Sequence, residues 1–227
     1  PTRELAIQIL ENFKTYSKYT NLTTAAVFGG VSLEPQKDIL AHGVDILIAT
    51  PGRLIDLYLQ GFVDLSAIEI FVLDEADLML DMGFIPDVER ICKLISGKRQ
   101  TLLFSATMPK EIQKLADSFM SNPARVEVAP PSSPVENVEQ RIVYLSPRQK
   151  DLTLRKIIKA AEVHTAIIFC NRKRDVDALF KSLKSTGLSV AALHGDMAQS
   201  YRMEVLANFK AGDVPILEAG LPELVLE

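Results

Sequence analysis

A group of acidic residues stands directly after one of the most apolar stretches of the chain. Asp74, Glu75 and Asp77 follow the run 68–73. In open α/β sheets, ligands bind at the carboxyl ends of strands, where an aspartate can hold Mg2+ and a neighbouring glutamate can orient an attacking water. The helix dipole also favours acidic residues where a helix begins. The four residues 74–77 alone therefore fit a hydrolytic metal site and a plain helix start about equally well.

Residues that could hold phosphate occur at three places before this acidic group. Arg3 carries a planar guanidinium that can form paired hydrogen bonds with a phosphate. Gly29 and Gly30 lack a Cβ and allow another backbone to come close. The segment 50–53 precedes a predicted helix, whose free N–H groups can bind an anion. Taken singly, a solvated arginine, a tight turn and a helix cap explain these features more simply.

Short hydroxyl residues and a histidine stand at other predicted strand ends. Ser105 and Thr107 follow the run 100–104, where a turn stabilised by their hydroxyl groups before Pro109 is the simpler interpretation. His194 follows the run 190–193, and a lone histidine is more often structural than functional. By themselves these residues do not define a site.

Apolar runs alternate with amphipathic stretches along the whole chain, as expected of strands and helices that position such residues. The predicted strands are 24–28, 45–49, 68–73, 100–104, 140–144, 166–170 and 190–193. The predicted helices are 5–16, the segment from 50 through 59, 109–120, 149–161, 174–185 and 199–209. This alternation predicts an α/β fold with parallel sheets and helices on both faces.

A Pro/Ser-rich segment interrupts the alternation. Residues 130–134 read Pro-Pro-Ser-Ser-Pro, a composition that disfavours helix and strand and predicts a linker. We therefore expect a first domain over 1–129, a linker over 130–137 and a second domain over 138–227. The tail 215–227 is atypical.

The net charge, the apolar runs and the cysteines of the chain restrict the classes of function that it can have. The 227 residues carry a net charge of -4, so any nucleic-acid binding must use local donors rather than a global positive field. Neither a membrane-spanning run nor a signal peptide is visible, which favours a cytoplasmic location. Cys92 and Cys170 lack metal-ligand spacing, and we expect both to be small buried hydrophobes.

Taken together and in order, these motifs resemble the DEAD-box ATP-dependent RNA helicases of superfamily 2. The similarity extends from residue 1 to about residue 214. Its segments are 1–6 (PTRELA), 29–30 (GG), 50–53 (TPGR), 74–77 (DEAD), 105–107 (SAT), 168–171 (IFCN) and 194–202 (HGDMAQSYR). One such motif is weak evidence, but this many in order make coincidence a poor explanation.

The resemblance implies two RecA-like domains that close on ATP, Mg2+ and RNA. It gives Asp74 the role of magnesium ligand through water, and Glu75 that of orienting the attacking water. Asp77 would belong to the same catalytic motif, and Ser105 and Thr107 would couple hydrolysis to the RNA side. Contacts to the RNA sugar-phosphate backbone would come from Pro1, Thr2, Arg3, Gly29, Gly30, Thr50, Pro51, Gly52, Arg53, Asn171, Arg172, His194, Gly195, Asp196, Gln199 and Arg202.

The chain departs from the family pattern at both ends. It has no G-x-x-x-x-G-K-[ST] phosphate loop (Walker A), and after Val214 we find neither the later helicase motifs nor any arginine. We therefore expect a fragment of a parent helicase, with both domains incomplete and no ATP turnover of its own. The alternatives are a non-enzymatic RNA-binding fragment and a related DNA helicase. The acidic quartet 74–77, together with segments 1–5 and 105–107, argues against the DNA enzyme.

Overall fold

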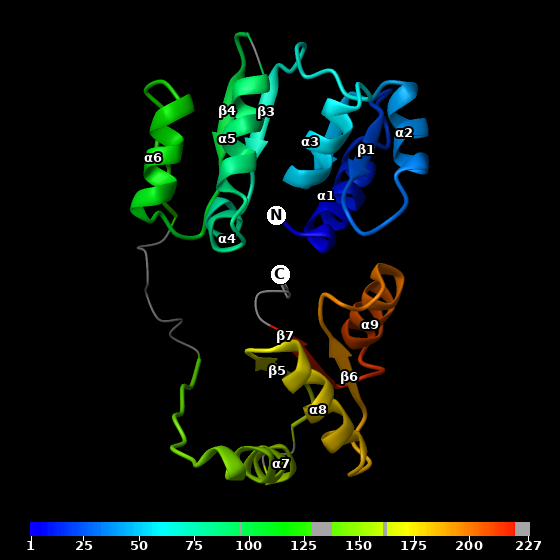
Figure 1. The fold of residues 1–227 in the computed structure, drawn as a ribbon, viewed down its shortest axis with the longest axis vertical. Helices are drawn as coiled ribbons and strands as arrows, with labels where there is room; N and C mark the ends of the chain where they lie inside the picture. The colour runs from blue at the N-terminus through cyan, green and yellow to red at the C-terminus, as the bar shows by residue number, and fades with distance from the viewer. Residues whose placement is uncertain (96, 129–137, 161–162, 221–227) are drawn as a thin grey trace. The chain divides into compact units, whose positions relative to one another are not determined.

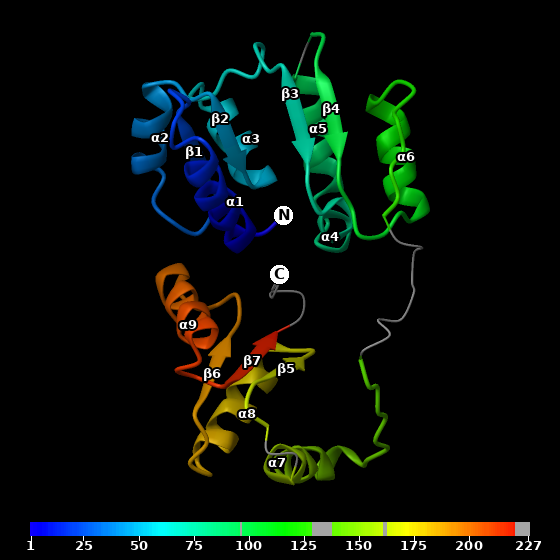
Figure 2. The same cartoon turned by 180° about the vertical axis from the view of Figure 1, so that it is seen from behind.

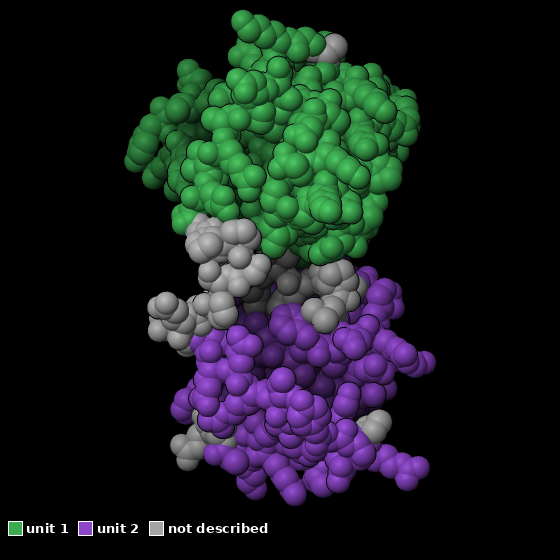
Figure 3. Space-filling model, turned by 90° about the vertical axis from the view of Figure 1, so that its left-hand side faces the viewer, with its two compact units in different colours: residues 1–136 green, residues 137–227 purple. Residues whose placement is uncertain are grey.

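The computed structural model describes residues 1–95, 97–128, 138–160 and 163–220 (Figure 1). The chain forms two compact units, residues 1–136 and residues 137–227, which Figure 3 distinguishes by colour. The predicted linker 130–137 lies outside the described residues, so the domain boundaries stay a prediction.

The strands of the first unit form two parallel pairs. β1 (Thr24–Val27) pairs with β2 (Ile46–Ala49), and β3 (Ile70–Leu73) pairs with β4 (Gln100–Leu103). Within each pair the two strands end at partnered residues, Val27 opposite Ala49 and Leu73 opposite Leu103. The segments that follow each pair therefore leave the sheet at the same edge, which is where the sequence places its polar motifs.

The first unit contains six described helices, and two apolar clusters pack the last four of them against these strands (Figures 1 and 2). The six helices are α1 (Arg3–Tyr16), α2 (Glu34–Ala41), α3 (Pro51–Leu59), α4 (Ala76–Asp81), α5 (Ile85–Leu94) and α6 (Lys110–Phe119). One cluster joins α3 to α5 through Leu54, Ile55 and Ile91. The other joins β3 to α4, α5 and α6 around Leu73, Met79, Val88 and Leu115.

One face of β3 differs from the expectation that helices cover both sheet faces. Ile70 and Val72 remain 60% and 50% exposed, while the alternate residue Leu73 is buried. The described helices of the first unit thus cover this strand on one side only.

The second unit is a three-stranded parallel sheet in the order β5-β7-β6, with β5 (Ala166–Cys170), β6 (Val190–Leu193) and β7 (Ile216–Gly220). Its helices are α7 (Lys150–Ala160), preceded by the 3-10 turn Pro147–Gln149, α8 (Lys173–Lys184) and α9 (Gln199–Ala211). α9 covers one face through Val205 and Leu206, and α7 and α8 cover the other through Ile158 and Leu183. Here the prediction of helices on both faces is confirmed.

Several predicted elements need correction. The predicted strand 140–144 is irregular, and Tyr144 is 91% exposed. A strand is stabilised by its neighbours, and no described strand pairs with this segment. Helices α2, α4 and α5 were not predicted, and neither was β7, which begins one residue into the tail regarded as atypical.

Candidate functional site

The acidic group 74–77 forms a sharp turn between β3 and α4. Glu75 has φ 52°, a left-handed conformation that costs a residue with a side chain on the order of 1 kcal/mol. Its N–H donates to Asp74 Oδ1 at 3.0 Å, and the Ala76 N–H donates to the Phe104 carbonyl at 3.1 Å. The Glu75 side chain makes no capping hydrogen bond to α4. A plain helix cap therefore does not explain Glu75.

A hydrogen-bond network joins this turn to the residues after β4. The Thr107 N–H and hydroxyl both donate to Asp77 Oδ2, at 2.8 and 2.7 Å. In return, the Asp77 N–H donates to Ser105 Oγ at 3.1 Å, and the Ser105 hydroxyl donates to the Thr107 carbonyl at 2.7 Å. The turn that we expected of Ser105 and Thr107 is thus present, and Asp77 is its anchor. Three hydrogen bonds therefore link the turn after β3 to the segment after β4.

The electrostatics of Asp77 follow from this network. Partial burial acts to raise its pKa, but hydrogen bonds from Thr107, Ser105 and the Leu78 N–H outweigh burial and lower the pKa below its usual value. The carboxylate stays ionised at neutral pH and accepts hydrogen bonds with its full charge. Asp77 therefore serves as a connector between two strand ends, separate from the Asp74–Glu75 pair.

Arg3 lies against the glycines that follow β1. A Cβ at Gly30 would collide with the Arg3 guanidinium, and Gly30 has φ 78°, which favours glycine. Thr2 caps α1 because its hydroxyl oxygen accepts the Leu5 N–H at 3.2 Å. The cap fixes where the helix begins, and with it the position of Arg3. Arg3 is therefore packed on the glycine turn rather than freely solvated.

Arg53 joins the segment after β2 to the same turn. Its Nη2 donates to the Val31 carbonyl at 3.2 Å, and only 13% of the side chain is exposed. The Thr50 N–H donates to the Val27 carbonyl at 3.0 Å. Gly52 is exposed, and no atom lies within 4 Å of the position that a Cβ would take. Arg53 thus supports the turn, while the start of α3 at Gly52 faces open space.

The start of α1 lies beside both groups of residues. Pro1 is buried and within electrostatic reach of Glu75 and Asp74, and Arg3 covers Gly30 two residues later. The predicted residues of the first unit therefore come together along one edge, at the carboxyl ends of β1 to β4.

The predicted residues of the second unit also gather at strand ends. Asn171 and Arg172 follow β5 and are exposed, as are Gly195 and Asp196 after β6. Gln199 and Arg202 on α9 are buried, with 6% exposed in each case. These two residues therefore lie beneath the surface that the exposed four present. Sequence reasoning had given all six the same role.

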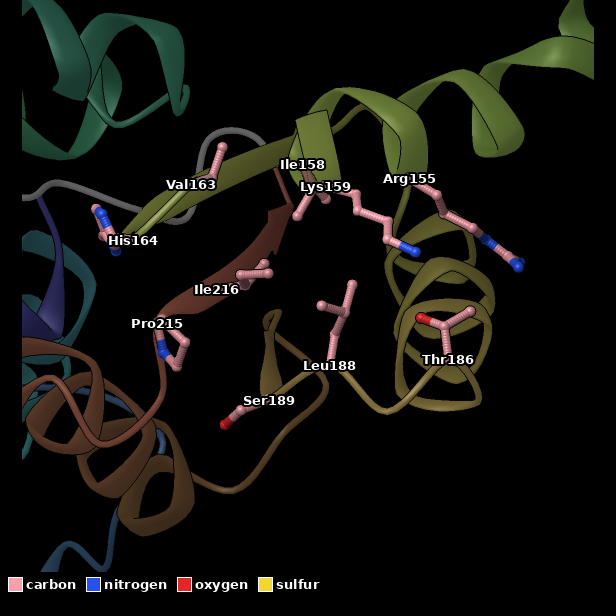
Figure 4. A pocket seen from close by; sticks show the side chains of 10 residues that line it. All are labelled: Arg155, Ile158, Lys159, Val163, His164, Thr186, Leu188, Ser189, Pro215 and Ile216. Carbon is pink, nitrogen blue, oxygen red and sulfur yellow. The ribbon is translucent and has the colours of Figure 1, made fainter. Parts of the chain in front are cut away.

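A pocket of about 710 Å3 lies at the opposite end of the same sheet (Figure 4). Its lining includes His164 and Ser189, which precede β5 and β6, and Pro215 and Ile216 at the start of β7. The pocket is at the amino ends of the strands and contains none of the predicted site residues.

The described residues offer neither an enclosed metal site nor a membrane-spanning helix. They contain no cluster of three or more His, Cys, Asp or Glu side chains that could enclose a metal ion. Mg2+ typically uses one or two carboxylates together with substrate phosphates and water, which the Asp74–Glu75 turn suits. Among the described helices, none combines the length and apolar character needed to cross a bilayer.

Two α/β units with parallel sheets, and polar motifs at the carboxyl ends of their strands, define the RecA-like core of two-domain helicases. Residues 1–115 match the family model described as DEAD/DEAH box helicase, and residues 149–219 match the helicase conserved C-terminal domain. The chain belongs to the DEAD/DEAH box helicase family. The second match extends five residues past Val214, where we expected the similarity to stop.

Several curated relatives and solved structures resemble the chain along nearly its full length. It is 39% identical to the DEAD-box ATP-dependent RNA helicase CshA of Streptococcus pneumoniae over 219 residues, which cover 96% of the chain and 42% of CshA. It is 42% identical to the ATP-dependent RNA helicase DBP2 of Encephalitozoon cuniculi over 220 residues, covering 96% of the chain and 44% of DBP2.

The structure of S. cerevisiae Dbp5 bound to RNA and ADP BeF3 matches with a TM-score of 0.84 at 27% identity, covering 97% of the chain and 56% of Dbp5. A DEAD box protein from Methanococcus jannaschii matches with a TM-score of 0.54 at 37% identity, covering 97% of the chain and 59% of that protein. The chain spans about half the length of the relatives it matches.

Proposed function

We propose that this chain is the part of an ATP-dependent RNA helicase that couples ATP hydrolysis to movement of the RNA-binding surface. The network between Asp77, Ser105 and Thr107 carries the proposal, because it ties the turn holding Asp74 and Glu75 to the neighbouring strand end. A change in the nucleotide beside that turn would be transmitted through these short hydrogen bonds.

The first unit would bind RNA through its sugar-phosphate backbone. Arg3 lies against the Gly29–Gly30 turn, Arg53 donates to the Val31 carbonyl just after it, and Gly52 leaves the start of α3 open. Backbone N–H groups and a guanidinium suit phosphate oxygens and carry no base specificity. Several relatives are named RNA helicases, and a structural neighbour is described as bound to RNA, which supports RNA as the partner.

ATP and Mg2+ would meet the first unit at the Asp74–Glu75 turn. Asp74 would hold Mg2+ through water, and Glu75, held in its left-handed conformation, would orient the attacking water. Bound Mg2+ would neutralise charge on the transferred phosphoryl group. The cytoplasmic location expected from the sequence stays a prediction.

The Glu75→Gln variant tests this assignment in a full-length helicase that contains the chain. We expect RNA-stimulated ATP turnover to fall by about 100-fold or more, because an amide cannot accept the proton of the attacking water. RNA affinity in the presence of a non-hydrolysable ATP analogue should be retained. The two quantities are measured by phosphate release and by fluorescence anisotropy.

Glu69→Gln is the matched control, because Glu69 lies just before β3 and outside the acidic turn. It should leave turnover unchanged. Normal turnover by Glu75→Gln would disprove the assigned role. Equal stimulation of the unmodified protein by single-stranded DNA would favour the DNA helicase alternative, and RNA binding that never responds to ATP would favour a non-enzymatic function.

A further inference from the structure

Two charged residues of α8 contact the turn that follows β6. Lys173 Nζ lies 2.7 Å from Asp196 Oδ1, and Asp177 Oδ1 lies 3.2 Å from His194 Nε2. Lys173 and Asp177 are four residues apart, so they lie on the same face of the helix. One helix face therefore contacts both ends of the short segment 194–196, and neither residue was predicted from the sequence to take part in a site.

The turn itself is compact. The Met197 N–H donates to the His194 carbonyl at 3.1 Å, and the His194 N–H lies 3.4 Å from the Met197 sulfur. The His194 residue is only 8% exposed. Gly195 and Asp196, by contrast, face solvent. The buried histidine is thus the fixed end of the turn, and the exposed residues next to it depend on how that ring is held.

The contact with Asp177 determines how the ring of His194 is held. A carboxylate only accepts hydrogen bonds when ionised, so Nε2 must carry the proton. Among the described residues, Nδ1 is buried and has no hydrogen-bond partner. The orientation of the ring therefore depends on this one polar contact.

The contact between Lys173 and Asp196 has a different effect. Both side chains are at least half exposed, so the pair adds little to stability. It nevertheless neutralises an aspartate on a surface assigned to RNA, where an unpaired carboxylate would repel phosphate. Consistent with this pairing, the hydrogen bond and charge of Lys173 lower the pKa of Asp196. Asp177 is also half exposed, but the ring that it contacts is buried, so of the two contacts this is the one that fixes the buried end of the turn.

We propose that Asp177 is a positioning residue for RNA binding, which holds His194 so that the 194–197 turn presents Gly195 to the RNA backbone, with Lys173 neutralising Asp196. The proposal rests on the proposed RNA-binding function. Asp177 itself touches no RNA in this arrangement. Its contribution is to order the turn before RNA arrives, which spares the complex the cost of ordering it on binding.

Binding of a fluorescein-labelled single-stranded oligouridylate to the 227-residue chain, followed by anisotropy, tests the proposal. We expect Asp177→Ala to weaken binding about 5- to 10-fold, the size of one ordinary intramolecular hydrogen bond, because Asp177 is partly exposed to solvent. Asp177→Asn should restore most of the affinity, because its amide oxygen can still accept the Nε2 proton. His194→Ala should weaken binding similarly, and the double variant Asp177→Ala/His194→Ala should bind no more weakly than either single variant.

Asp175→Ala is the matched control. It removes the same charge from the same helix, but Asp175 pairs with Arg174 and not with the turn. It should bind RNA like the unmodified chain.

Unchanged affinity in Asp177→Ala would overturn the proposal. The proposal would also be overturned if Asp177→Asn did not restore the affinity and the double variant showed the sum of the two single losses. Asp177 would then act on RNA binding by a route other than His194. Absence of RNA binding by the unmodified chain would instead refute the proposed function.

Discussion

Gly30 and Arg3 depend on each other at the level of single residues. Gly30 has a positive φ, and the Arg3 guanidinium occupies the space that a Cβ would fill. Gly61 has nearly the same φ, 79° against 78°, but nothing lies within 4 Å of its Cβ position. The two glycines therefore separate the cost of backbone conformation from the cost of displacing Arg3.

Gly61→Ala should destabilise the first unit by about 1 kcal/mol, the strain of a left-handed alanine, and should leave RNA affinity unchanged. Gly30→Ala should show the same strain, a further loss of stability from the displaced arginine, and weaker RNA binding. Urea unfolding and RNA anisotropy on the same samples measure both effects. Equal behaviour of the two variants in both assays would show that the contact between Arg3 and Gly30 contributes nothing.

The types and order of the site residues could be predicted from the sequence, but their surroundings could not. Arg53 reads as a phosphate ligand beside a helix start, yet its side chain is mostly covered and donates to Val31, 22 residues away. The left-handed conformation of Glu75 has no local signature, since it is fixed by hydrogen bonds between two strand ends. Contacts between residues that are far apart in the chain cannot be inferred from the spacing of residue types along the sequence.

At the scale of elements, the clearest anomaly is a glutamate in the central strand of the second unit. Glu218 lies on β7 between Ile168 of β5 and Ala192 of β6, and its side chain is fully buried. Among the described residues, neither of its carboxylate oxygens has a hydrogen-bond partner. Burial, and secondarily the charge of Asp151, raises the pKa of Glu218 to about 8.

The stability of the second unit should therefore fall as pH rises from about 4.5 to about 8, because the unfolded chain loses this proton first. Glu218→Val should abolish that decline and gain on the order of a few kcal/mol over the unmodified chain between pH 5 and pH 8. Urea unfolding followed by circular dichroism at several pH values measures the free energy of unfolding of both chains. Glu204→Ala, which removes an exposed carboxylate from α9, is the control and should keep the original pH profile. Parallel profiles for Glu218→Val and the unmodified chain would contradict the prediction.

The same glutamate explains why β7 was missed. The predicted strands 166–170 and 190–193 are continuous apolar runs and match β5 and β6 residue for residue. In β7 the apolar run is broken by Glu218 and ends at Gly220. The opposite error occurred at 140–144, where the short apolar run Ile142 to Tyr144 has no described strand to pair with. An apolar sequence pattern forms a strand only where a neighbouring strand is available to pair with it.

For the whole molecule, the net charge of -4 limits how RNA can be attracted. Binding must rely on a few donors at strand ends, so its salt dependence should be shallow. For single strands, each phosphate contact contributes about 0.7 to the slope of log K against log salt. Arg3→Ala should reduce the slope by about that amount, whereas Arg90→Ala, on the exposed side of α5, should not. Anisotropy titrations at several salt concentrations measure the slope, and an unchanged slope in Arg3→Ala would exclude Arg3 as a phosphate contact.

The position of β7 also has a consequence for synthesis on the ribosome. β5 and β6 each pair with β7 and, in the described sheet, not with each other. The partner of Ala166 is Ile216, some 50 positions later, whereas in the first unit the partner of Thr24 is Ile46, only some 22 positions later. The first unit can pair its strands soon after each emerges. The second must keep β5 and β6 unpaired until residues 216–220 have left the exit tunnel, so a nascent chain paused before that point would be a natural substrate for chaperones.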